Sequence, residues 1–342
     1  MNQMKPVIFV VAILITLTFI LPSLLVLPFS GKKTVEKLGD SETPTTQPPP
    51  SNNEPATEVG VLRSATNNIE KLPIEEYVIG VVASEMPANF EPEALKAQAL
   101  TARTYITSHL LNADNANLPE GADVADTVNY QVYKDKSELK KSWGKNYDSN
   151  YKKVANAVKQ TQDKILTYEE KPITASFFSA SNGFTENAED YWENQVPYLK
   201  SVESPWDSKE SPEFESQISL STKEFEQKLG VDIGKGADVG RIIARTPGKK
   251  VAEVEINGKK FTGREIREKL GLRSTDFDWV HKGDAIIITT KGFGHGVGMS
   301  QYGANGMAKE GKDYQEIVNH YYHGVKISDI RPYFDQKLAF NQ

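Results

Sequence analysis

A glutamate at the end of an apolar segment is the first residue in this sequence with a clear chemical signature. Glu85 lies in the run Val-Ala-Ser-Glu-Met-Pro, directly after an apolar helix-like stretch and just before the break at Pro87. Burial penalises the charged form of a carboxylic acid and so raises its pKa. An acid that keeps its proton to a higher pH can serve as a general acid. The sequence therefore predicts that Glu85 is the catalytic residue.

The segment that follows is predicted to form a helix over Pro92 to Leu111, with polar residues beside its buried face. Its apolar stripe at helical spacing consists of Leu95, Ala99, Ala102, Ile106 and Leu110. The polar residues next to this stripe are candidates for holding a substrate or supporting the acid: Gln98, Arg103, Thr104, Tyr105 and His109. The alternative is an amphipathic helix with ordinary border residues.

A glycine-rich segment spans residues 291–304, with four glycines around His295. Glycine permits positive φ and a close approach of backbone to a ligand. No Gly-Lys-Ser/Thr follows, which argues against a phosphate cradle. We expect a wall that faces the substrate, with His295, Gln301 and Tyr302 among its contacts. The alternative is a tight loop in which backbone groups satisfy His295.

A third cluster, residues 179–185, combines small hydroxyl residues with a glycine at a predicted strand end, and Trp192 and Tyr198 follow it. Sugar rings present C–H faces to aromatic side chains and hydroxyls to small polar ones. The candidates for carbohydrate binding here are Ser181, Gly183 and Thr185. The alternative is a β-turn followed by two core aromatics.

Other chemistries have weaker support in the sequence. The net charge of −6 argues against a nucleic-acid partner. There is no cysteine and no His-Glu-x-x-His pattern, and His320 and His323 lie on a predicted amphipathic helix, so no metal or other cofactor is expected. The Gly-x-Ser-x-Gly elbow of serine hydrolases is also absent.

The N-terminal part of the chain predicts a membrane anchor and a tether. Residues 7–29 form an almost unbroken apolar run, long enough to span a bilayer. Lysines flank this run on both sides and leave its orientation open, so residues 1–6 are expected in the cytoplasm only because the function of the body requires the body to lie outside. Residues 30–58 include a Pro/Thr/Asn-rich tract that predicts a disordered linker. A single large body should occupy residues 59–335, with residues 112–150 as a polar surface insertion.

The body mixes strands and helices without a βαβ rhythm, which predicts an α+β fold. Expected strands cover residues 59–64, 165–168, 173–179, 241–246, 251–256, 259–261 and 285–290. Expected helices cover residues 73–85, 92–111, 151–161, 222–229, 263–270 and 314–322. The pair Asn257-Gly258 predicts a hairpin turn.

Several of these motifs resemble the stage II sporulation protein D family. They are residues 84–87, 94–105 and 294–304, with residues 181–185 between them. The resemblance implies a single-pass membrane protein whose extracytoplasmic domain is a lytic transglycosylase of peptidoglycan, used while the mother-cell membrane engulfs the forespore. It implies glycan strands stripped of stem peptides as substrate, with the amidase stage II sporulation protein P and the membrane protein stage II sporulation protein M as partners. Residues 112–150 lack the Cys and His residues that resemble a metal site in some clostridial members.

A single glutamate is sufficient for this reaction. Glycoside hydrolases normally use two carboxylates. In a lytic transglycosylase the sugar's own C6 hydroxyl closes onto C1, so Glu85 protonates the leaving oxygen and then takes the C6 hydroxyl proton. One rival hypothesis is a non-catalytic module that binds glycan and stimulates a cell-wall amidase, as the occurrence of this domain in amidase enhancers implies. Another is a structural tether in the septum, which leaves Glu85 unexplained.

Overall fold

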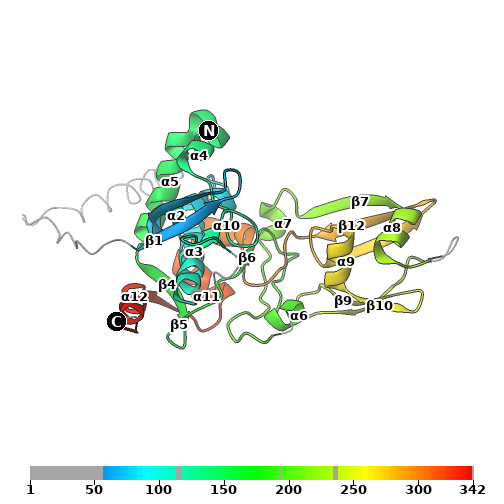
Figure 1. The fold of residues 1–342 in the computed structure, drawn as a ribbon. Coiled ribbons are helices and arrows are strands. Elements are labelled where there is room, and N and C mark those ends of the chain that lie inside the picture. The colour runs from blue at the N-terminus through cyan, green and yellow to red at the C-terminus, as the bar shows by residue number, and fades with distance from the viewer. Residues whose placement is uncertain (1–56, 113–117, 193, 234–237, 341–342) are drawn as a thin grey trace, which may run out of the picture. The chain divides into compact units, whose positions relative to one another are not determined.

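The computed structural model describes residues 57–112, 118–192, 194–233 and 238–340, and it has an α+β fold (Figure 1). The helices are α2 (Ile74–Glu85), α3 (Pro92–Asn112), α4 (Lys136–Trp143), α5 (Tyr147–Gln160), α6 (Ala188–Trp192), α7 (Asp207–Glu210), α8 (Thr222–Leu229), α9 (Gly263–Leu270), α10 (Gln301–Lys309), α11 (Tyr314–Tyr321) and α12 (Arg331–Phe340). Within these ranges no helix is long and apolar enough to cross a membrane. The expected anchor at 7–29, the residues before it and the linker up to residue 56 lie outside the described residues.

The strands belong to several small sheets. They are β1 (Glu58–Arg63), β2 (Asn68–Pro73), β3 (Val124–Ala125), β4 (Lys164–Tyr168), β5 (Lys171–Pro172), β6 (Phe177–Phe178), β7 (Glu215–Ser221), β8 (Arg241–Arg245), β9 (Val251–Ile256), β10 (Lys259–Thr262), β11 (Asp276–Lys282), β12 (Ala285–Lys291), β13 (Met299–Ser300) and β14 (Lys326–Asp329). The sheet orders are β2-β1-β3, β14-β4-β5, β13-β6, β10-β9-β8 and β11-β12-β7.

One hydrophobic core surrounds α3. This helix packs against α2, α5, α10, α11 and β4, and its alanine and aliphatic residues from Ala94 to Ile106 are buried. Alanine and leucine favour the helix, and the small side chains of the alanines let the neighbouring helices approach closely. Glu85 is the last residue of α2, and only a short turn that begins at Met86 separates it from α3. The packed helix α3 therefore helps to fix the position of Glu85.

A second core lies between α8, α9 and the strands β7 to β12. Local sequence fixes its elements: Ser221 caps α8, and Thr262 with Glu265 forms a capping box on α9. The turn between β9 and β10 is the predicted Asn257-Gly258 pair, with φ of 46° and 77°.

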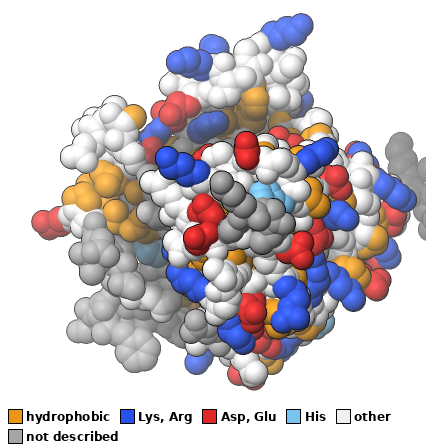
Figure 2. All heavy atoms as spheres, turned by 90° about the vertical axis from the view of Figure 1, so that its right-hand side faces the viewer, with side chains coloured by type: hydrophobic (Ala, Val, Ile, Leu, Met, Phe, Trp, Pro, Cys, Tyr) orange, Lys and Arg blue, Asp and Glu red, His pale blue; other side chains and the backbone are white. Residues whose placement is uncertain are grey.

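Figure 2 shows one face of the molecule, on which Lys and Arg side chains are interspersed with Asp and Glu side chains.

The predicted helices agree with the structure most closely at α8 and α9, whose bounds match, and within a few residues elsewhere. The expected strand over 173–179 is wrong, since only Phe177 and Phe178 pair there, in parallel with Met299 and Ser300.

The expected surface insertion at 112–150 also differs from the structure. Residues 113–117 lie outside the described residues, but β3 pairs with β1, and Tyr133 and Leu139 are buried in the first core. Alternating buried apolar positions in this otherwise polar segment anchor it to the body. It therefore forms part of the scaffold around α2.

Candidate active site

Glu85 lines a pocket of about 570 Å³ at the C-terminal end of α2. The other residues of this pocket come from distant parts of the chain: Tyr105, Val128, Tyr130, Gln131, Val132, Thr174, Ala175, Ser176, Phe177, Phe178, Trp192, Arg267, Gly294 and His295. Ala175 belongs to the first hydrophobic core, and Tyr130, Phe177 and Trp192 pack against that core, so tertiary structure assembles the site. Most of the lining residues are apolar or aromatic, which suits the faces of sugar rings.

The end of α2 sets the position of the glutamate. Met86 leaves the helix in an extended conformation, with φ of −124° and ψ of 135°, while its N–H still donates to the carbonyl of Val82. The residue before a proline is disfavoured in the α region, so Pro87 explains why the helix ends here. Glu85 is consequently the last helical residue, and its half-buried side chain points into the pocket rather than along the helix surface.

The environment of Glu85 favours the neutral acid. Burial raises its pKa above the ordinary value of 4.5, and the hydrogen bond from the N–H of Val132 to Oε1, at 3.1 Å, opposes this shift in part. Among the described residues no cation forms an ion pair with this carboxylate, and no other carboxylate lines the pocket. A shielded acid without a charged partner is the arrangement that a general acid requires.

His295, which also lines the pocket, lies among three aromatic rings. Its ring lies 5.2 Å from that of Trp192, 5.7 Å from Phe178 and 5.8 Å from Tyr191. Burial, followed by the charge of Arg267, lowers the pKa of His295 to about 4. Its Nδ1 accepts a hydrogen bond from the N–H of Val297, so the imidazole is neutral with its proton on Nε2.

The backbone of the glycine-rich loop that carries His295 lies very close to residues 176–178. Gly298 has φ of 79°, and a Cβ atom there would lie 2.0 Å from the carbonyl oxygen of Ser176, a pocket residue. Gly294 has φ of 119°, and a Cβ atom would lie 2.7 Å from that of Phe178. The glycines therefore let the loop lie against the β6 segment and complete the wall.

Comparisons with known proteins agree on one family. The family model described as "Stage II sporulation protein" (SpoIID) matches residues 63–168, which include Glu85. Stage II sporulation protein D of Bacillus amyloliquefaciens is 54% identical over 344 residues, covering 98% of this chain and 99% of that protein. The protein of the same name from Bacillus subtilis is 50% identical over 342 residues, with the same coverage. The chain belongs to the stage II sporulation protein D family.

A more distant relative carries a different name. The amidase enhancer of Bacillus subtilis is 29% identical over 307 residues, which cover 73% of this chain and 40% of the relative. The domain of the stage II sporulation protein D family is thus similar to part of a longer protein with another described role.

The structure places three of the predicted site residues of this family member in the pocket: Glu85, Tyr105 and His295. Trp192, expected beside the hydroxyl cluster, also lines it. The ring of Tyr105 stacks on His109 with centroids 6.1 Å apart, and His109 in turn meets Tyr130 edge-on. Tyr105 and Tyr130 line the pocket with Glu85, whereas His109, which contacts both rings, is not among the lining residues.

Arg103 and Thr104 lie in the core instead. Arg103 is fully buried, and its guanidinium donates to both carboxylate oxygens of Glu75, at 2.8 and 2.7 Å, and to the carbonyls of Val158 and Lys164. Thr104 accepts a hydrogen bond from the N–H of Leu166. Both residues use their polar groups to join α3 to its neighbours, which leaves none for a sugar.

Gln98 and Gln301 face each other between α3 and α10, with Nε2 of Gln301 3.5 Å from Oε1 of Gln98. Both are buried and neither lines the pocket. Tyr302 packs edge-on against Phe90, with ring centroids 5.0 Å apart, and it is also absent from the pocket wall. These residues support the helices below the site.

The hydroxyl cluster also has an internal role. Asp207, a fully buried residue that the sequence analysis did not single out, accepts hydrogen bonds from the N–H and Oγ of Ser181 and from Oγ of Ser204 and Ser300. Gly183 donates its N–H to Oγ of Ser181. The Oγ1 of Thr185 donates to the carbonyl of Lys200 and accepts from the N–H of Val202. The expected carbohydrate contacts at these positions are instead internal hydrogen bonds.

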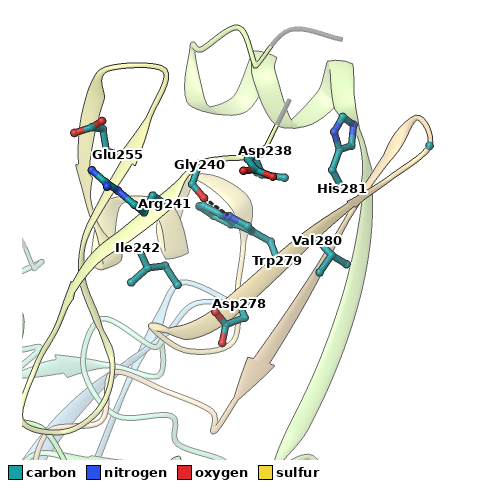
Figure 3. Close-up of a pocket in the computed structure, with 11 residues that line it drawn as sticks. Asp238, Gly240, Arg241, Ile242, Glu255, Asp278, Trp279, Val280 and His281 are labelled. Carbon is teal, nitrogen blue, oxygen red and sulfur yellow. Dashed lines mark hydrogen bonds between the residues drawn. The ribbon is translucent and has the colours of Figure 1, made fainter. Parts of the chain in front are cut away.

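A second, larger pocket of about 1010 Å³ lies between the edge strands β8 and β11 (Figure 3). Trp279 reaches across it and donates from Nε1 to the carbonyl of Gly240, at 3.3 Å. Its carboxylates are Asp238 and Asp278, which are exposed to solvent, and the half-buried Glu255 of β9. Exposed carboxylates lack the shielding of Glu85, so we place the candidate active site at the smaller pocket.

In the described part of the chain, no three His, Asp or Glu side chains converge as a metal site would require.

Proposed function

We propose that this protein is a peptidoglycan lytic transglycosylase that acts on peptide-stripped glycan strands. It would cleave the bond between MurNAc and GlcNAc and leave 1,6-anhydro-muramic ends. The observation that carries the proposal is the state of Glu85: a shielded acid that is the only carboxylate among the described residues of its pocket. Hydrolysis with a second carboxylate as nucleophile or base has no candidate residue in that wall.

The reaction needs only this group and the substrate. Protonated Glu85 gives its proton to the bridging oxygen as the bond from C1 to that oxygen breaks. The C6 hydroxyl oxygen of the same sugar then bonds to C1, and its proton passes to the carboxylate. Glu85 ends the cycle protonated, so no water and no second acid are consumed.

The rest of the pocket supports binding of a sugar chain. Trp192, Tyr105 and Tyr130 offer ring faces to the C–H faces of sugars. His295 is neutral, so this ring adds no positive charge that would favour the ionised form of Glu85.

The biological setting belongs to the same proposal. Its support is the family of sporulation proteins to which the chain belongs and the apolar run at residues 7–29. We propose a membrane-anchored protein with its body outside the cytoplasm, which degrades peptidoglycan while the mother cell engulfs the forespore. Stage II sporulation protein P would supply peptide-free strands, and stage II sporulation protein M would hold the complex in the membrane.

A second candidate is a non-catalytic module that binds glycan and activates a cell-wall amidase. The name of the Bacillus subtilis relative, amidase enhancer, favours it. Mass spectrometry of peptide-free glycan strands incubated with the purified protein separates the two. Anhydro-muramic ends support the transglycosylase, unchanged strands support the activator, and reducing ends would indicate a hydrolase.

A further inference from the structure

Arg267 is the only Lys or Arg among the described residues that line the Glu85 pocket. It lies on α9, whose Ile266 and Leu270 are buried in the second core. This anchoring holds the half-buried Arg267 side chain at the wall of the pocket. A cation in a largely aromatic pocket is not explained by the proton transfers of Glu85.

Two hydrogen bonds orient the guanidinium. Its Nη1 donates to the phenolic oxygen of Tyr191 at 2.7 Å, and Nε donates to the carbonyl of Leu272 at 3.3 Å. The Nη2 group makes no hydrogen bond to any described residue, and no described carboxylate forms an ion pair with Arg267. By contrast, Arg264 on the same helix pairs with Glu268 at 2.8 Å. Arg267 is therefore held in place while one edge of its planar group stays available.

An oriented guanidinium with an available edge matches one ligand chemistry especially well. Arginine stays protonated and binds carboxylates through two parallel N–H···O bonds. The charge of Arg267 also contributes to the low pKa of His295, which lines the same pocket. A carboxylate bound here would be partly shielded from water, so its interaction with the guanidinium would be stronger than on an open surface.

We propose that Arg267 is a specificity-determining residue that binds the free lactyl carboxylate of a peptide-free muramic acid. The inference rests on the proposed function, since it takes peptidoglycan glycan as the ligand of the pocket. In intact peptidoglycan that carboxylate is an amide and carries no charge. An amidase that removes the stem peptide creates the anion, and GlcNAc has no lactyl group. Recognition of this one group would make the preceding amidase step a condition for tight binding.

The test compares three forms of one glycan: peptide-free strands, the same strands with their lactyl carboxylates converted to methylamides, and strands that retain stem peptides. Binding to the Glu85→Gln full chain is measured, so that cleavage does not interfere. We expect methylamide conversion to weaken binding by about 10-fold or more, because a charge-assisted hydrogen bond is lost. Strands that retain stem peptides also contain carboxylates, and equally tight, Arg267-dependent binding of those strands would mean that a peptide carboxylate is the ligand and would overturn the proposal.

Substitution of the arginine gives the second arm. Arg267→Gln, in the same Glu85→Gln background, should bind both peptide-free forms with the weaker affinity, so that the preference for the free carboxylate disappears. Lys269→Gln is the matched control, because it removes an equal charge from an exposed position on the same helix that is outside the pocket. It should keep the preference. A Glu85→Gln chain indifferent to methylamide conversion, or an Arg267→Gln variant that keeps the preference, would overturn the inference.

These outcomes separate the inference from the proposed function. If wild-type protein forms anhydro ends and Glu85→Gln shows no carboxylate preference, only the role of Arg267 fails. If no anhydro ends form but the Arg267-dependent preference is present, the enzyme proposal fails and the carboxylate site stands. The comparison of glycan forms uses no Arg267 variant, so it remains decisive even if Arg267→Gln does not fold.

Discussion

The N–H of Val132 donates a hydrogen bond to the carboxylate of Glu85 across 3.1 Å. These two residues are 47 positions apart in sequence and join the end of α2 to a segment that is polar overall. The bond fixes the direction of the acid without supplying a charge, so it positions Glu85 while burial keeps its pKa raised. A cationic partner would have the opposite effect, because it would favour the ionised form.

We predict that Glu85→Gln stabilises the protein at neutral pH. Burial raises the pKa of Glu85 in the folded protein above its value in the unfolded chain. The wild-type protein is therefore most stable below the unfolded pKa, where the carboxyl is protonated in both states, and it loses free energy of unfolding as pH rises through the folded pKa. Glutamine stays neutral throughout. The variant should therefore exceed wild type in free energy of unfolding at pH 7, by about 1.4 kcal/mol for each unit of pKa shift, and the difference should vanish below pH 4. Urea unfolding across this pH range checks the prediction, and a constant difference would contradict it.

The pH dependence of kcat/KM should show one limb that belongs to Glu85. The free enzyme needs the protonated acid, so the rate should fall as pH rises through a pKa above 4.5. The pKa of His295 is about 4, so this ring stays neutral from pH 5 upward and adds no limb there. The measurement is kcat/KM on peptide-free strands between pH 4 and 9. Loss of activity upon acidification from pH 7 to 5 would show that a basic form of another group is required.

Arg103 should be needed for stability rather than for sugar binding. Arg103→Leu removes the bidentate partner of Glu75 and two hydrogen bonds to carbonyls. We expect a loss of about 2–4 kcal/mol in free energy of unfolding, below the upper range for buried pairs because Glu75 is partly exposed. The activity of each folded molecule should remain near that of wild type. Full stability with weakened glycan affinity would instead place Arg103 in the binding site.

Asp207 should contribute to the stability of the fold, because it accepts hydrogen bonds from three buried serines. Asp207→Asn keeps the shape but replaces one acceptor oxygen with a donor, so at least one hydroxyl loses its partner. We expect the free energy of unfolding to fall by about 2–4 kcal/mol, as measured by thermal or urea unfolding. Asp148→Asn, at an exposed position in the first turn of α5, is the control and should cost less than about 1 kcal/mol. Equal effects of the two substitutions would contradict a special role for the serine network.

Local sequence signals predicted much of the fold. Helices α8 and α9 have caps and periodic apolar residues, and the β9–β10 hairpin has Asn257-Gly258, so their bounds follow from short-range chemistry. The strand expected at 173–179 failed because β-propensity does not decide pairing, and only two of its residues find a partner.

The site was predicted less completely, for a physical reason. Glu85 could be found because an acid at the end of an apolar helix is a local pattern. Ser181 and Arg103 have the residue types of a binding site, but Asp207 and Glu75 satisfy them internally, and those partners are distant in sequence. Val132 and Arg267 enter the site only through tertiary packing. An arginine on an amphipathic helix such as α9 has no local signature that marks it as a residue of the pocket.

The most direct test of the central claim is mass spectrometry of peptide-free glycan strands incubated with wild-type protein and with Glu85→Gln. We predict 1,6-anhydro-muramic ends with wild type and a loss of at least about 100-fold in their rate of formation with Glu85→Gln, because general acid catalysis is removed. The variant should still bind the strands. Anhydro ends formed at the wild-type rate by Glu85→Gln would contradict the account.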